Sequence, residues 1–129
     1  MVVAGLAFAG VAALIHVYIF YLESVVWTSR RARAVFGIAS EQEALTTRAL
    51  AFNQGFYNLF LAVAIVLGIV VLAVGATAVG ATLVFTGAGS MVAASLVLLV
   101  SRPAMVRGVL VQGVAPLLGI VALAAGLAS

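Results

Sequence analysis

Four long apolar stretches make up most of the chain, and short polar stretches separate them. Each is long enough for the about 20 residues that a helix needs to cross a bilayer. None shows the alternation of a barrel strand. The pattern predicts an all-α, integral membrane four-helix bundle, formed as a single transmembrane domain over residues 1–129 with a cytoplasmic loop over 28–45. We place the helices at about residues 2–27, 46–74, 79–101 and 107–128.

Composition supports a membrane protein and excludes several other classes. Hydrophobic residues make up 67% of the 129 residues and charged residues only 7%, whereas about a quarter of the residues in soluble domains are charged. The chain has no cysteine and one histidine. This excludes disulfides and thiolate metal sites, so we predict no metal and no cofactor.

The arginines indicate how the chain is oriented. Arg30, Arg31 and Arg33 lie in the first loop, Arg48 follows it, and the third loop carries Arg102 and Arg107. Basic loops stay in the cytoplasm. Both termini are therefore expected outside, in a multi-pass protein of the inner (plasma) membrane. The basic charge sets topology, so we expect the lipid bilayer as a partner and no nucleic acid.

Loop one carries helix signals of its own. Ser40 is a suitable N-cap, with Glu43 three residues later as in a capping box. The second helix is therefore expected to begin with an exposed turn in the cytoplasm. Val35, Phe36 and Ile38 form an apolar patch suited to the membrane interface. Loop one is either a flank that sets topology or a lid over a site below it.

Polar residues gather in the cytoplasmic half of the predicted bundle. His16 and Glu23 share one face of the first helix, and two stripes spaced by four residues carry the polar groups of the second. Ionisable residues inside membrane helices mark functional sites by default. We therefore predict a polar pocket between the first two helices, closed by the fourth, where Pro116 frees a carbonyl. Its candidate ligand-binding residues are His16, Tyr21, Glu23, Trp27, Asn53, Gln54, Tyr57, Asn58 and Gln112.

Each of these residues also has a structural interpretation. Glu23 could pair with Arg48, Arg102 or Arg107 at the inner rim. His16 could be a neutral imidazole that bonds to Asn53 or to a tyrosine hydroxyl. The amides could be inter-helix hydrogen bonds, worth about 0.6 kcal/mol each. The number of polar residues at one depth favours a pocket.

Several short motifs resemble those of a family of small bacterial four-helix membrane proteins, the domain of unknown function 1304. The chain reads HVYIFYLE, then W with a basic stretch and VFG, then NQGFYNLFLA, and late in the chain QGVAP. The resemblance covers nearly the whole chain, although the third predicted helix of the chain matches the family only in being hydrophobic. It implies four membrane helices and no established activity. The matching positions are His16, Tyr18, Tyr21, Glu23, Trp27, Phe36, Gly37, Asn53, Gln54, Gly55, Tyr57, Asn58, Gln112, Gly113 and Pro116.

Three functions fit these residues. In the first, the chain binds or transports a small molecule, with Glu23 exchanging a proton and aromatic rings holding an organic cation. The rings are those of Tyr18, Phe20, Tyr21, Trp27 and Tyr57. In the second, a membrane enzyme acts on a lipid-soluble quinone or isoprenoid, with His16 and Glu23 as acid and base. In the third, the chain is a structural subunit.

Transport by so small a chain requires a homo-oligomer, and we expect a dimer. Small residues of the third and fourth helices would allow its close packing. These are Gly80, Gly87, Gly89, Ala93, Ala115, Gly119, Ala122 and Gly126.

Overall fold

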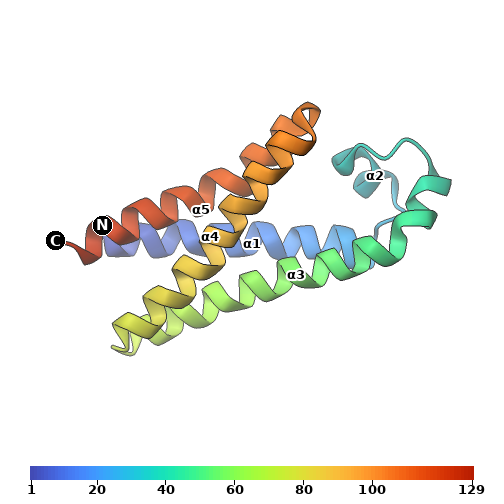
Figure 1. Cartoon of the computed structure of the whole chain (residues 1–129). Coiled ribbons are helices and arrows are strands. Elements are labelled where there is room, and N and C mark those ends of the chain that lie inside the picture. The colour runs from blue at the N-terminus through green and yellow to red at the C-terminus, as the bar shows by residue number, and fades with distance from the viewer.

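The computed structural model describes all residues from Met1 to Ser129 and contains helices and no strand. Four long helices cross one another, and both termini lie at the same end of the bundle (Figure 1). This confirms the all-α four-helix fold. The elements are α1 (Val2–Phe20), η1 (Tyr21–Val25), α2 (Arg30–Phe36), α3 (Glu41–Ala73), α4 (Thr77–Ser101), η2 (Pro103–Met105) and α5 (Val106–Leu127).

The four long helices have the length and apolar composition to cross a membrane. Their bounds correct the prediction at two places. The first span ends at Val25, before Trp27, and the second begins at Glu41 instead of residue 46. α3 therefore has 33 residues, which is about 50 Å at 1.5 Å per residue. A hydrocarbon core is about 30 Å thick, so α3 is longer than is needed to cross it.

Close packing near the termini depends on glycine. A Cβ on Gly5 of α1 would lie 2.5 Å from the backbone nitrogen of Leu123 in α5. A Cβ on Gly68 of α3 would lie 2.8 Å from the carbonyl oxygen of Gly80 in α4. Alanine and glycine let membrane helices approach this closely. At this end of the bundle, α1 packs on α5 and α3 packs on α4.

The opposite end carries the arginines. There the helices separate into two pairs, one of the first span with α3 and one of α4 with α5. We call this end, formed by α2, the first turns of α3 and the α4–α5 connection, the arginine end. Here the close glycine contacts lie within the pairs: Gly55 of α3 touches η1, and Gly113 of α5 touches Ser95 of α4. The α4–α5 pair turns away from α1 and α3 toward this end (Figure 1).

The short helix α2 is well defined at both ends. The Ser29 side chain accepts a hydrogen bond from the Ala32 backbone N–H, and Gly37 ends the helix at a φ of 67°. Such a φ is open to glycine and strained for other residues. The Trp27 ring packs on Phe36 with centroids 5.1 Å apart. These contacts hold α2 against the end of the first span.

The start of α3 shows the predicted N-terminal cap. The Glu43 backbone N–H donates to the Ser40 hydroxyl at 3.0 Å. The Glu43 carboxylate accepts from the backbone N–H of Ala39 at 3.0 Å, one residue earlier than in the standard capping box. Trp27 also links the end of the first span to α3, because its indole N–H donates a hydrogen bond to the Thr47 hydroxyl at 3.2 Å.

Candidate functional site

The first membrane span changes from α-helix to π-helix at Tyr21. The Val26 backbone N–H donates to the Tyr21 carbonyl at 3.1 Å, five residues earlier. Such single π-turns are rare and often lie at functional sites. Here the turn contains Glu23, the one acidic residue of the first span.

Glu23 and Asn58 meet across the contact between η1 and α3. The Asn58 amide nitrogen donates to the Glu23 carboxylate at 2.8 Å and to the Gln54 carbonyl at 3.1 Å. Both acceptors are oxygens, which establishes the orientation of the amide. The alternative interpretation, in which Glu23 pairs with Arg48, Arg102 or Arg107, does not hold in the structure, because the side-chain hydrogen bond of Glu23 is the bond to Asn58.

Gly55 and Ser24 bring these two groups together, and Ser24 is not among the predicted site residues. The Ser24 hydroxyl donates to the Phe52 carbonyl at 2.9 Å. A Cβ on Gly55 would overlap Ser24 Oγ and would lie 3.1 Å from both Glu23 Cβ and the Phe20 carbonyl oxygen. The glycine within the NQG motif was the signal for this close crossing.

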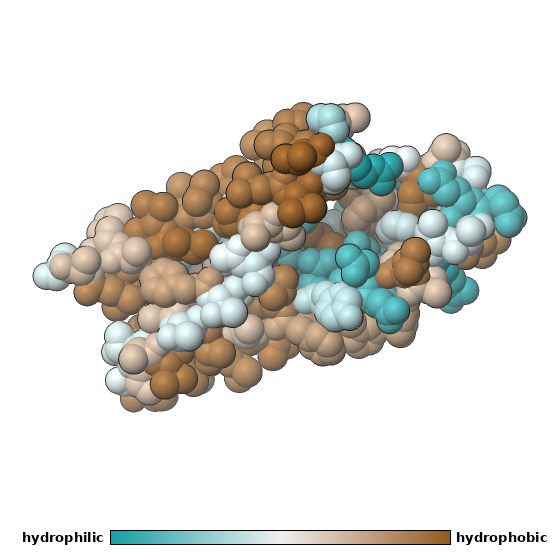
Figure 2. Space-filling view, viewed as in Figure 1, coloured by the Kyte–Doolittle hydropathy of each residue, from teal (hydrophilic) through white to brown (hydrophobic).

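The close crossing also corrects the position of the predicted pocket. Because η1 and α3 touch at Gly55, no cavity separates them there. The molecule is instead hollowed between α3 and the arginine-end half of α4, and polar residues gather in that hollow (Figure 2). We call this the polar hollow. Gln54 and Asn58 lie four residues apart on one stripe of α3, beside Glu23.

The second predicted stripe of α3 lies elsewhere. Asn53 lines a shallow groove of about 500 Å³ with Leu45, Arg48, Ala49 and Phe52. Asn53 has no side-chain hydrogen bond, and Tyr57 is 63% exposed. Helical spacing alone could not decide which of the two stripes faces the first helix. Tertiary packing brings Gln54 and Asn58 to Glu23 and leaves Asn53 apart.

His16 is buried and makes its hydrogen bond within its own helix. Its side chain is 1% exposed, and Nδ1 lies 2.9 Å from the Ala12 carbonyl oxygen. The expected bonds to Asn53 or to a tyrosine hydroxyl are absent. No hydrogen bond joins His16 to Glu23 either.

Gln112 lies level with His16 on the facing helix. Gly119 packs on Ala9, and moving seven residues along each antiparallel helix, from 9 to 16 and from 119 to 112, pairs these two positions. Gln112 is half-buried and makes no side-chain hydrogen bond. Pro116 is buried inside α5, which continues through it as one helix.

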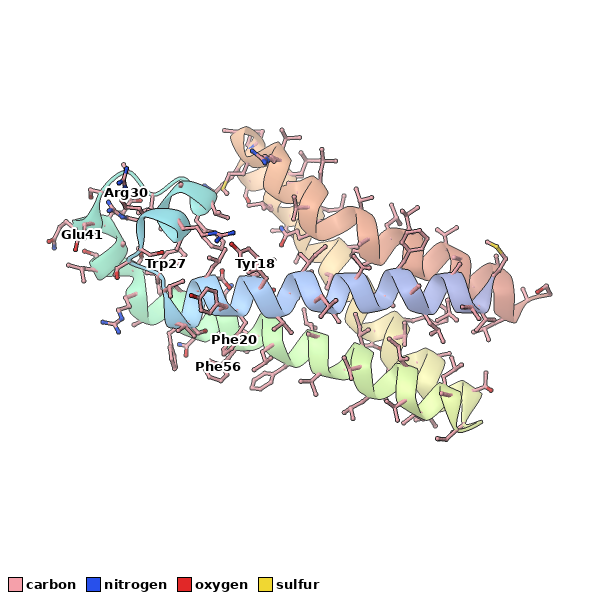
Figure 3. The ribbon with its side chains drawn as sticks, turned by 180° about the vertical axis from the view of Figure 1, so that it is seen from behind. Tyr18, Phe20, Trp27, Arg30, Glu41 and Phe56 are labelled. Atoms are coloured by element: carbon pink, nitrogen blue, oxygen red, sulfur yellow. The ribbon has the colours of Figure 1, made fainter.

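The aromatic residues are divided among separate contacts and do not form one cage around Glu23. The guanidinium carbon of Arg31 lies 5.4 Å from the centre of the Tyr18 ring, so an internal cation already covers that ring. Tyr18 and Tyr21 are stacked with centroids 6.4 Å apart. Figure 3 shows Tyr18 facing the side of α2, whereas Phe20 and Phe56 meet at α3 with centroids 5.1 Å apart.

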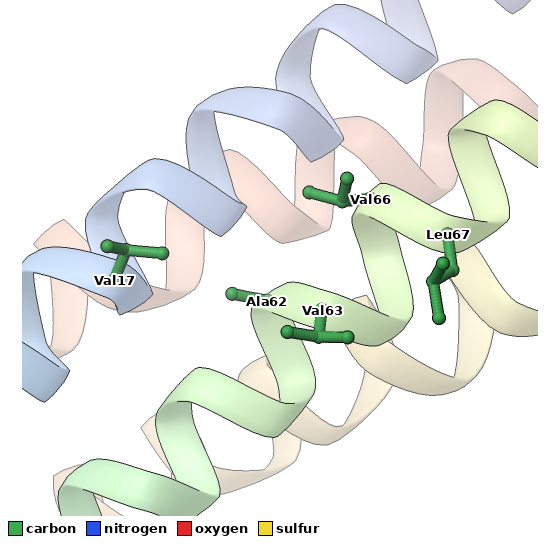
Figure 4. Close-up of a pocket in the computed structure, with 5 residues that line it drawn as sticks. All are labelled: Val17, Ala62, Val63, Val66 and Leu67. Atoms are coloured by element: carbon green, nitrogen blue, oxygen red, sulfur yellow. The ribbon is translucent and has the colours of Figure 1, made fainter.

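A small apolar groove lies on the outer surface between α1 and α3. Its volume is about 170 Å³ (Figure 4). All five residues that line it are hydrophobic. Its lining residues are Val17, Ala62, Val63, Val66 and Leu67.

Comparison with known proteins identifies the family. The model described as "Protein of unknown function (DUF1304)" matches residues 10–124. The chain belongs to the DUF1304 family. No curated protein and no solved structure matches it. The matched range contains all of the Glu23 site, and several of the motif residues that pointed to DUF1304 have a structural role here: Gly37 ends α2, and Gly55 and Gly113 permit close helix crossings.

Proposed function

We propose that this DUF1304 protein binds a small organic cation at Glu23 and Asn58 and transports it across the bacterial inner membrane in exchange for a proton. The observation that carries the proposal is the Glu23 carboxylate, which lies within a membrane-length helix with an asparagine as its hydrogen-bond partner and no arginine. Ionisable groups inside membrane spans are rare and mark functional sites by default.

The hydrogen bonds of the pair support one class of ligand. Both hydrogens of the Asn58 amide are used, one by Glu23 and one by the Gln54 carbonyl. The groups left free are the Asn58 carbonyl oxygen and the remaining lone pairs of the carboxylate, all of which are acceptors. A ligand that fits must donate hydrogen bonds and carry positive charge, as a protonated amine or a guanidinium does.

The polar hollow supports entry from the arginine end. Polar residues gather there between α3 and α4 (Figure 2). All six arginines lie at that end, so by the positive-inside rule we expect it in the cytoplasm and both termini outside. The chain has no cysteine. Single cysteines at Ser40 and Ser129 should therefore react from the inside and from the outside, respectively, with a membrane-impermeant maleimide; the reverse labelling would contradict this orientation.

The geometry gives less support to the alternative functions. An enzyme that uses His16 and Glu23 as acid and base needs a proton path between them, and no hydrogen bond links the two. A structural subunit would not need a carboxylate with free acceptor sites. The homodimer stays a prediction. Four of the glycines proposed for its interface already pack inside the protein: Gly80 and Gly87 contact α3, and Gly119 and Gly126 contact α1.

Methylguanidinium is a suitable probe because it keeps its charge and donates hydrogen bonds. Tetramethylammonium is the control cation, since it cannot donate. We expect methylguanidinium alone to raise the unfolding temperature of the purified protein and to drive proton flux in proteoliposomes that contain a pH-sensitive dye. Glu23→Gln should lose both effects. Glu41→Gln removes the same charge from an exposed position of α3 and should keep them. Equal responses in the two variants would show that Glu23 is not the cation site.

A further inference from the structure

The short helix α2 concentrates positive charge that the protein itself does not neutralise. Arg30, Arg31 and Arg33 lie within four consecutive positions. None of them forms a salt bridge or a side-chain hydrogen bond, and Arg31 rests on the Tyr18 ring. Arg30 lies at the outer edge of this end, away from Tyr18 (Figure 3).

Arg33 differs from the other arginines in one respect. Its Nε atom is buried and has no hydrogen-bond partner. Buried N–H groups in native proteins are almost always paired, and an exception requires an explanation such as a bound ion or water. Arg33 is half-buried, whereas Arg30 and Arg31 are exposed, and its guanidinium has no acceptor from the chain.

The position of α2 indicates which anion is available. α2 begins five residues after Val25, the last residue of the first span, and the apolar Val35 and Phe36 end it. Its backbone therefore lies at the level of the lipid headgroups. The acceptors at that level are phosphates, which arginine binds through two parallel N–H groups.

We infer that Arg33 anchors a binding site for the phosphate of an anionic phospholipid, at the end of the first span and independent of the Glu23 site. The negative surface of the cytoplasmic leaflet attracts the three arginines together. Partial burial holds the Arg33 side chain in place, which it does not do for the exposed Arg30 and Arg31. Lysine in its place keeps the charge and loses the planar fork of donors.

Trp27 provides the measurement, since it is the one tryptophan of the chain and packs on Phe36 of α2. The full chain in detergent micelles is titrated with phosphatidylglycerol, with phosphatidylcholine as the blank, while Trp27 emission is recorded. Native mass spectrometry counts the lipids bound. We expect a saturable change with phosphatidylglycerol that phosphatidylcholine does not produce.

Two matched substitutions separate a site from general surface attraction. Arg33→Lys should weaken the apparent affinity at least tenfold, whereas Arg48→Lys, at an exposed arginine of α3, should change it less than twofold. Far-UV circular dichroism confirms that both variants keep their helix content, and Arg33→Gln repeats the test without the charge.

Three results would overturn the inference. Equal affinity in wild type and Arg33→Lys would show that charge alone attracts the lipid. A saturable response to millimolar inorganic phosphate that equals the response to phosphatidylglycerol would assign the site to a free anion. No response to either would show that Arg33 binds no phosphate.

Discussion

Replacing Gly55 by alanine should separate η1 from α3 and destabilise the protein. The added methyl would overlap the Ser24 hydroxyl and press on Glu23 Cβ and the Phe20 carbonyl oxygen, each at 3.1 Å. Because one of the three is backbone, rotating a side chain cannot relieve the whole overlap. Overpacking of this kind costs about 1–3 kcal/mol.

Two further contributions change the expected loss of stability in Gly55→Ala. Separation of the helices would lengthen the Ser24–Phe52 and Glu23–Asn58 hydrogen bonds, worth about 0.6 kcal/mol each inside a membrane. Alanine in a helix regains about 0.5–1 kcal/mol over glycine. The net loss is therefore about 1–3 kcal/mol.

The assay is thermal or denaturant unfolding in detergent. Gly89→Ala is the matched control, since a Cβ at this helical glycine of α4 would meet nothing within 4 Å. We expect the control to be neutral or slightly stabilising and Gly55→Ala to unfold earlier. Adding Ser24→Ala removes the nearest atom, so the double variant should recover part of the loss, as a double-mutant cycle would measure. If Gly55→Ala is as stable as the control, the close crossing does not exist in the folded protein.

Three other substitutions test separate contacts by the same unfolding assay. The methyl group of Gly5→Ala would meet backbone and side-chain atoms of α5 at 2.5–2.8 Å, so this variant should lose about 2 kcal/mol or more of stability. Gly10→Ala is its control, because open space surrounds that position, and it should lose none. Equal stabilities of the two variants would contradict the α1–α5 packing. Trp27→Phe keeps the ring stack and loses the bond to Thr47, so a loss within about 1.5 kcal/mol is expected, and a much larger loss would mean that ring volume matters more. Gly37→Ala has free space but a φ of 67°, so backbone strain alone should cost about 1–2 kcal/mol, and no loss would show that α2 ends differently.

The membrane character of the chain and its helices could be predicted from the sequence because both depend on local properties. An apolar run of about 20 residues must satisfy its backbone hydrogen bonds internally, and a helix does so. The cap at Ser40 is likewise local, since its partner Glu43 is three residues away. α3 begins at Glu41, directly after this cap; that its first turn lies outside the membrane stays a prediction.

The arrangement of the polar residues depended on contacts between distant segments. Spacing placed Asn53 and Asn58 on neighbouring stripes of one helix, and only the crossing at Gly55 decided that Asn58, and not Asn53, bonds to Glu23. The π-turn could not be predicted, because nothing in YLESV departs from an ordinary helical sequence. α2 and its Arg31–Tyr18 contact were also missed, since a seven-residue helix has too few hydrogen bonds to be stable alone.

The sequence by itself therefore determined that this protein is a bundle of four membrane-length helices with a carboxylate in the first. Hydrophobic length and charge distribution suffice for that. The tertiary structure alone decided that Glu23 meets an amide instead of an arginine and that the polar hollow lies between the two helix pairs. Both follow from where glycine lets two helices touch, and hydrophobic periodicity, which is nearly the same on every face of these helices, cannot specify that position.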